Sequence, residues 1–253
     1  MSVTVLDAGR GIAPRRSLPP EEAARLADLR AKAEGRDAVA LLRLALIEEF
    51  PGEAAVVSSF GAESAVLLDL IARVDPAAPV LFLNTGKLFG ETLRYRDRLQ
   101  EHLGLIDIRT IGPDPRDRAL LDPDGVLWSR DTDACCGFRK VAPLKRALAP
   151  FAAQITGRKR FQTGARTLMQ AVEFFEGRFR FNPLADWTQS DIEAYFAGHR
   201  LPRHPLAEDG YPSIGCMPCT RRVQPGEGYR DGRWSGLDKD ECGIHTGVDG
   251  EGI

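Results

Sequence analysis

The sequence lacks any uncharged run approaching the roughly eighteen residues that span a membrane. Residues 1–20 carry scattered charges and no continuous apolar core, so no secretory signal is predicted. Positive charge is not in excess either, since 34 Lys and Arg stand against 36 Asp and Glu. This balance disfavours the coating of nucleic acid. These absences predict a cytoplasmic protein that binds neither membrane nor nucleic acid.

Cysteine is scarce and unevenly placed. The chain has five cysteines, an odd number, all in its C-terminal half. A secreted disulfide framework would be shorter and richer in cysteine. Two pairs and one remaining thiol favour a metal centre together with one thiol kept for chemistry. The pairs are Cys135 with Cys136 and Cys216 with Cys219, and the remaining thiol is Cys242.

The order of apolar runs predicts an α/β fold. Apolar runs at 54–60, 80–83 and 106–111 alternate with helical patterns that end near 74 and 103. This alternation predicts βαβ units and a parallel sheet with ligands at the carboxyl ends of its strands. Further predictions are helices at 21–34, 37–50, 141–148 and from Thr188, strands at 153–156 and 180–182, and a mobile loop over 113–134. The predicted division is an N-terminal helical segment (1–50), a nucleotide-binding domain (51–225) and a flexible tail (226–253).

The cysteine pairs have several possible uses. Four thiolates bind zinc or an iron–sulfur cluster. The side chains of adjacent cysteines diverge. They therefore suit neighbouring atoms of a metal cluster better than one metal ion. The pattern therefore favours a cluster, with structural zinc, buried thiols or a redox pair as alternatives.

The turn at 58–64 (Ser-Ser-Phe-Gly-Ala-Glu-Ser) follows the first predicted strand. Small residues there allow backbone N–H groups and hydroxyls to approach a phosphate at the start of a helix. The turn lacks the lysine of a P-loop, which disfavours Walker-type binding. An ordinary tight turn between strand and helix is the alternative.

The C-terminal segment carries Cys242 next to Gly243. A thiol on an exposed, flexible segment can be delivered to a substrate and withdrawn. Glu241 should raise the pKa of this thiol, so its activation needs a cation from elsewhere. The candidate cations are His245, Lys140, Arg230 and Arg233. A disordered tail with a spare cysteine is the alternative.

Together these segments resemble the bacterial assimilatory adenylylsulfate reductases, within the adenylylsulfate/phosphoadenylylsulfate reductase family of PP-loop-like (adenine nucleotide alpha hydrolase-like) folds. The motifs, in family order, are Ser-Ser-Phe-Gly-Ala-Glu (58–63), Asn-Thr-Gly (84–86), Cys-Cys-Gly-Phe-Arg-Lys (135–140), Phe-Asn-Pro-Leu (181–184), Ile-Gly-Cys-Met-Pro-Cys-Thr-Arg (214–221), Gly-Arg-Trp (232–234) and Glu-Cys-Gly-Ile-His (241–245).

The resemblance implies that the paired cysteines ligate a 4Fe-4S cluster and that Cys242 attacks the sulfur of adenylylsulfate. AMP leaves, Cys242 carries a sulfonate, and thioredoxin or a glutaredoxin-like dithiol releases sulfite for cysteine biosynthesis. Together with the helical N-terminus, it predicts a homo-oligomer. The implied substrate-binding residues are Ser58, Ser59, Phe60, Gly61, Thr85, Gly86, Lys140, Arg230, Arg233 and His245.

The chain departs from the family pattern at three positions. Lys159 stands at a usual arginine, Asn84 at a usual aspartate, and Thr132 where some relatives have a histidine. One rival is reduction of the 3′-phosphorylated nucleotide, although reductases of that kind typically lack the four cluster cysteines. A PP-loop sulfurtransferase or ATP pyrophosphatase is disfavoured because the turn is not Ser-Gly-Gly-x-Asp-Ser. A rival of another class is a non-catalytic sensor of nucleotide or cluster.

Overall fold

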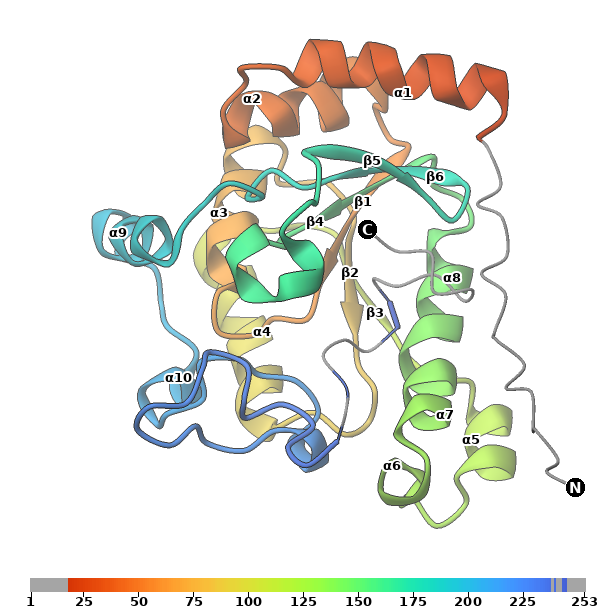
Figure 1. The fold of residues 1–253 in the computed structure, drawn as a ribbon, viewed down its shortest axis with the longest axis vertical. Helices are drawn as coiled ribbons and strands as arrows, with labels where there is room; N and C mark the ends of the chain where they lie inside the picture. The colour runs from red at the N-terminus through yellow and green to blue at the C-terminus, as the bar shows by residue number, and fades with distance from the viewer. Residues whose placement is uncertain (1–17, 238, 240–242, 245–253) are drawn as a thin grey trace, which may run out of the picture.

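The structure is a computed structural model that describes residues 18–237, 239, 243 and 244. Its centre is a six-stranded sheet in the order β3-β2-β1-β4-β6-β5 (Figure 1). The strands are β1 (Ala54–Ser58), β2 (Val80–Leu83), β3 (Ile108–Ile111), β4 (Ala153–Thr156), β5 (Val172–Phe175) and β6 (Arg178–Phe181). Neighbouring strands pair in parallel, except for the antiparallel pair of β5 and β6. The predicted α/β fold is confirmed.

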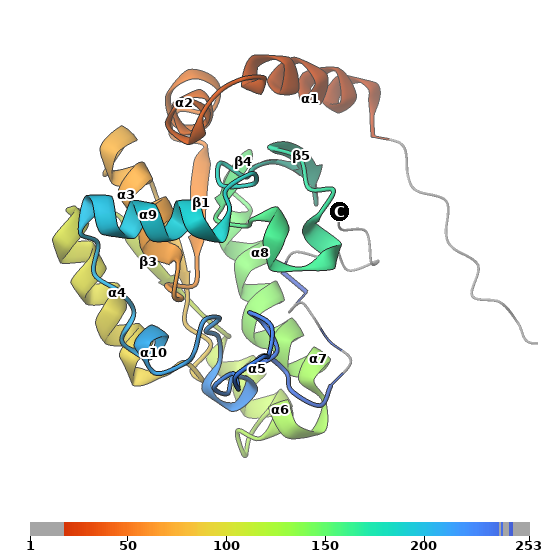
Figure 2. The same cartoon turned by 60° about the vertical axis from the view of Figure 1, so that its left-hand side comes forward.

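Helices lie on both faces of this sheet, with α3, α4 and α9 on one side and α7 and α8 on the other (Figures 1 and 2). The helices are α1 (Pro20–Ala33), α2 (Ala38–Arg43), α3 (Ser64–Val74), α4 (Gly90–Leu103), α5 (Pro115–Leu121), α6 (Leu127–Arg130), α7 (Thr132–Cys136), α8 (Ala142–Leu148), α9 (Gln189–His199) and α10 (Pro205–Glu208). π-Helical turns at Leu44–Glu49 and Gly137–Val141 continue α2 and α7. In the part of the chain that is described, no helix is both long and apolar enough to cross a membrane.

Alternate residues of the central strands enter two cores, as the pleat of a sheet requires. Val56 and Ile155 join the larger core, which also contains buried residues of α1, α2, α3, α4 and α9. Val57 and Leu83 join the smaller core, which packs against Leu144 of α8. Both faces of the sheet are therefore covered, and its carboxyl edge is left for a ligand.

The predicted mobile loop at 113–134 is wrong, because α5, α6 and most of α7 lie there. The aspartates that favoured a loop begin the helices instead. Asp114 accepts a hydrogen bond from the N–H of Arg116 (2.7 Å), and Asp131 accepts one from that of Ala134 (2.8 Å). Aspartate at these positions stabilises a helix start by accepting from otherwise unbonded N–H groups.

The β5–β6 hairpin was only half predicted, because the sequence analysis placed no strand at 172–175. The hairpin turns through Glu176 and Gly177, whose φ angles are 49° and 77°. Two consecutive positive φ angles are typical of a two-residue hairpin, and glutamate is an unusual first residue for one. The antiparallel strand lies at the edge of the sheet, where Arg30 of α1 donates to the carbonyl of Val172 (3.0 Å).

Candidate functional site

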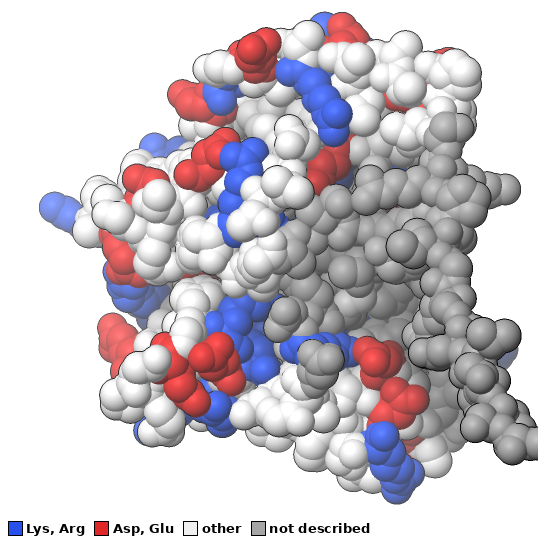
Figure 3. All heavy atoms as spheres, in the orientation of Figure 1, with Lys and Arg blue, Asp and Glu red and all other residues white. Residues whose placement is uncertain are grey.

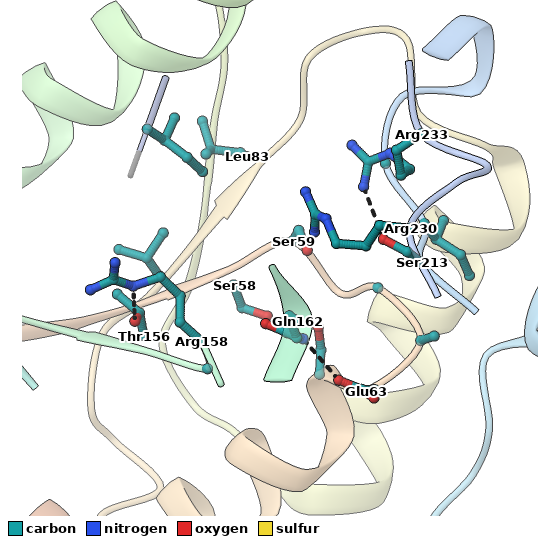
Figure 4. Close-up of a pocket in the computed structure, with 18 of the residues that line it drawn as sticks. Ser58, Ser59, Glu63, Leu83, Thr156, Arg158, Gln162, Ser213, Arg230 and Arg233 are labelled. Carbon is teal, nitrogen blue, oxygen red and sulfur yellow. Dashed lines mark hydrogen bonds between the residues drawn. The ribbon is translucent and has the colours of Figure 1, made fainter. Parts of the chain in front are cut away.

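A cleft lies at the carboxyl ends of β1, β2 and β4. Its volume is about 1150 Å³, which includes space that is open to solvent. The turn after β1 (58–64), the residues after β4 (156–159) and the C-terminal loops (212–216 and 229–234) line it. In Figure 4, Arg230 and Arg233 approach from the C-terminal loops and Arg158 from the β4 side, with Ser58 between them. This is the edge of a parallel sheet at which ligands bind.

The turn after β1 brings three of its predicted residues to the cleft, namely Ser58, Ser59 and Gly61. Phe60 differs: its ring is fully buried and packs edge-to-face on Phe82, with ring centroids 5.1 Å apart. Its φ of 50° is rare outside glycine and turns the chain sharply. Any ligand contact of Phe60 would therefore involve its backbone.

The turn after β2 ties the sheet edge to a cysteine. Thr85 is buried and lines the cleft, with its Oγ1 3.2 Å from the Sγ of Cys216. Asn84, at a departure from the family pattern, accepts a hydrogen bond from the N–H of Gly86 (3.0 Å). Gly86 has a φ of 70° and shapes the turn, but it is not among the residues that line the cleft.

Three of the basic residues that were predicted to bind substrate line the cleft: Lys140, Arg230 and Arg233. Arg233 donates from Nη1 to the hydroxyl of Ser213 (3.3 Å), which fixes its guanidinium beside the loop before Cys216. Figure 3 shows Lys and Arg side chains gathered near the centre of one face of the molecule. Such a gathering of cations favours a ligand with more than one negative charge.

The cleft also contains an acidic group that was not predicted from the sequence. Lys159 donates to Glu63 (2.6 Å), as does the side-chain amide of Gln162 (3.0 Å). Burial lowers the pKa of Lys159, even though Glu63 opposes that shift. Arg166 also lines the cleft and donates to Gln162. Glu63 ends the motif at 58–63, but Gln162 and Arg166 lie outside the family motifs, and the unusual lysine at 159 was the one signal for its ion pair with Glu63.

The four paired cysteines lie in two segments that meet beside the cleft. Cys135 and Cys136 end α7, whereas Cys216 and Cys219 flank a short 3₁₀ helix (Met217–Cys219). An isolated antiparallel bridge between Leu88 and Cys216 fixes the second segment to the sheet side. Cys136 packs in one cluster with Trp234 and Cys219. No disulfide joins any two of these four cysteines.

Burial raises the pKa of the Cys135 and Cys219 thiols, and their neighbouring cysteines raise it further. The Coulombic influence of Cys216 and Cys219 on Cys135 means that the two pairs are near each other. In the described part of the chain, no group of three or more His, Cys, Asp or Glu residues is arranged so that it could hold a metal ion.

Cys242 and His245 lie outside the described residues. Gly243 and Ile244, which follow Cys242 along the chain, are described. A side chain on Gly243 would come within 3.3 Å of Val141, and Ile244 lines the cleft. Ile244, two residues after Cys242, is therefore at the cleft.

The mainly parallel sheet, covered by helices on both faces, and the cation-lined cleft at its carboxyl edge define an α/β protein with a PP-loop-like fold. Residues 53–222 match the family described as the phosphoadenosine phosphosulfate reductase domain. The chain belongs to this family.

Curated relatives agree with this assignment. A protein of Mesorhizobium japonicum named adenosine 5′-phosphosulfate reductase is 52% identical over 222 residues, which cover 85% of this chain and 87% of the relative. A Chelativorans relative with the same name is 50% identical, with 77% and 79% covered. A Gloeobacter violaceus relative named phosphoadenosine 5′-phosphosulfate reductase is 40% identical, with 78% and 84% covered.

Solved structures confirm the fold. The phosphoadenylyl-sulfate reductase of Candida auris, in its phosphate complex, aligns with a TM-score of 0.66 at 24% identity, over 82% of this chain and 98% of that one. The FMN adenylyltransferase of Candida glabrata aligns with a TM-score of 0.52 at 15% identity, over 79% and 74%. At these identities the likeness concerns the fold alone.

Proposed function

We propose that the protein reduces adenylylsulfate to sulfite and AMP for sulfate assimilation and cysteine biosynthesis. The observation that carries the proposal is the gathering of Lys140, Arg230 and Arg233 in one cleft beside the paired cysteines. An anionic phosphosulfate needs positive charge around it before a thiolate can approach. The names of the relatives supply the nucleotide.

In the proposed reaction, the thiolate of Cys242 attacks the sulfur of adenylylsulfate. The bond between that sulfur and the bridging oxygen breaks, AMP leaves with the electron pair, and Cys242 carries the sulfonate. A dithiol of the thioredoxin type then attacks the sulfur of Cys242. Sulfite leaves with the bonding pair, and the second thiol releases Cys242 as the reductant becomes a disulfide. The two electrons come from the dithiol.

The four paired cysteines are proposed to hold a 4Fe-4S cluster. Their soft thiolate donors, on two segments that meet beside the cleft, fit such a group. When bound, the cluster would hold the two cysteine segments together beside the cleft and polarise the neighbouring site without changing its oxidation state. The same proposal includes thioredoxin as the partner, self-association as a homo-oligomer and a cytoplasmic location.

The test is one turnover of the anaerobically purified protein with labelled adenylylsulfate, without thioredoxin, followed by mass spectrometry of the Cys242 peptide. We expect a sulfonate adduct that added thioredoxin discharges as sulfite. Nucleotide binding without any adduct would instead support a non-catalytic sensor.

A second candidate is reduction of the 3′-phosphorylated nucleotide, which the name of the Gloeobacter violaceus relative favours. Steady-state assays with both nucleotides distinguish the candidates. We expect a higher kcat/KM with adenylylsulfate, and a tenfold preference for the 3′-phosphorylated nucleotide would reverse the assignment.

Replacing Arg233 with lysine tests the anion contact. We expect kcat/KM for adenylylsulfate to fall by roughly tenfold, because lysine keeps the charge but loses the planar fork that matches a sulfate or phosphate. The measurement is steady-state sulfite release. Arg221→Lys is the matched control, since Arg221 is a partly exposed arginine paired with Glu227 (2.7 Å) outside the cleft. Equal kcat/KM values for Arg233→Lys and the wild type would remove Arg233 from the site.

A further inference from the structure

The indole ring of Trp234 lies among four cationic side chains. All four lie within the roughly 6 Å at which the face of an aromatic ring attracts a cation. From the ring centroid, the distances are 4.4 Å to the Cζ of Arg233, 5.8 Å to that of Arg230, 5.9 Å to the Nζ of Lys140 and 5.8 Å to that of Lys239.

The cations around Trp234 come from separate parts of the chain. Lys140 belongs to the π-helical turn after α7, whereas Arg230 and Arg233 belong to the C-terminal loop. Lys239 forms an ion pair with Asp133 of α7. Like charges repel one another when they are brought together, and the negative face of an aromatic ring offsets part of that repulsion. Trp234 is therefore the common contact of the basic groups.

The backbone holds this ring in an uncommon conformation. Trp234 has a φ of 46°, which is a genuine outlier for a bulky residue. Its N–H donates to the carbonyl of Cys219 (3.1 Å), and its own carbonyl accepts from the N–H of Leu237 (2.9 Å). Its side chain is only 3% exposed and packs beside Cys136. Strain that the surroundings maintain in this way is typical of functional sites.

The indole Nε1–H has no hydrogen-bond partner among the described residues. Nothing in the described structure therefore requires an indole for its N–H group. The aromatic face is the property that distinguishes this side chain from a leucine of similar burial, and its larger area distinguishes it from a phenylalanine.

We propose that Trp234 is a positioning residue that holds three basic side chains of the cleft, Lys140, Arg230 and Arg233, together as one receptor for a phosphosulfate group. Trp234 acts through the cations and takes no part in bond making. The inference rests on the proposed function for the identity of the anion, but the gathering of cations around the ring is independent of it.

The experiment compares Trp234→Leu and Trp234→Phe by titration calorimetry with AMP and by steady-state sulfite release. For Trp234→Leu we expect roughly tenfold weaker AMP binding and a KM raised by a similar factor, with kcat changed less, because the aromatic face is lost. For Trp234→Phe, which keeps a smaller face, we expect roughly a threefold change. Trp187→Leu is the control, since Trp187 packs on Tyr195 of α9 and does not line the cleft.

A double-mutant cycle separates positioning from a general structural effect. If Trp234 acts through Arg233, the Trp234→Leu change must weaken AMP binding less in an Arg233→Gln background than in the wild type. Full additivity, or unchanged AMP affinity and KM in the single variants, would overturn the inference. If Trp234→Leu does not fold, Trp234→Phe decides the question by the same two readouts. AMP binding also keeps the test valid if the wild type reduces no adenylylsulfate.

Discussion

Replacing Cys216 with serine should remove both the visible absorbance of the bound cluster and the release of sulfite. A serine hydroxyl is not a thiolate, and Cys216 is a buried member of the two pairs that meet beside the cleft. Loss of a partner that merely supports a metal ligand typically costs 10–100-fold, so loss of a ligand should lower kcat/KM by more than about 100-fold. Iron content, absorbance and sulfite release are measured on the same anaerobic preparation.

Cys242→Ser is the matched variant, because it should remove the reaction and leave the cluster. We expect sulfite release to fall by at least ~10³-fold, as for removal of an enzymatic nucleophile, while iron content and AMP binding stay at wild-type values. Full iron content in Cys216→Ser would exclude Cys216 as a ligand. Undiminished sulfite release in Cys242→Ser would favour the sensor interpretation.

The parts of the fold that could be predicted from the sequence are those whose residues contact the core directly. The run that became β2 is continuously apolar and that of β1 is apolar up to Ser58, since both faces of these strands are buried. The turn at 58–61 ends the first of these runs, so its place at the sheet edge followed from the strand alone. The directions of the side chains in this turn could not be predicted in the same way. Phe60, whose φ is positive, lies in the core.

The parts that could not be predicted depend on contacts between distant segments. The helices within 113–134 begin at aspartates, and an aspartate that caps a helix has the same composition signal as one in a loop. The pairing of Glu63 with Lys159 joins residues 96 positions apart, and neither belongs to a motif that indicates an ion pair. The cations around Trp234 likewise meet only in the folded chain.

The buried ion pair between Arg139 and Asp122 connects the segment 113–134 to the site. The two side chains are 3% and 0% exposed. Arg139 also donates to the carbonyl of Thr85 (2.7 Å), whose hydroxyl contacts Cys216. Removing one partner of such a pair leaves an uncompensated buried charge. Asp122 is therefore the position outside the cleft at which a small change should have the largest effect on stability.

We expect Asp122→Asn to lower the free energy of unfolding by about 3 kcal/mol at pH 7. Burial alone would raise the pKa of Asp122, but its hydrogen bonds from Arg139 and from the N–H of Leu127 outweigh burial and hold that pKa below its ordinary value. A lowered folded-state pKa stabilises the fold above the unfolded value of about 4, and this contribution is lost as the pH falls through the folded-state pKa. The difference between variant and wild type should therefore shrink in acid.

Urea unfolding at several pH values, followed by tryptophan fluorescence at matched iron content, measures this difference. Asp124→Asn is the control, because Asp124 pairs with Arg130 at the surface, where both side chains are 44% or more exposed. Exposed pairs contribute about 0–1 kcal/mol, so this variant should unfold close to the wild type. Equal stabilities of the two variants at pH 7 would mean that the Arg139–Asp122 pair does not stabilise the fold. A large difference confined to Asp122→Asn, absent in acid, would place that stabilisation in the charge of this one carboxylate.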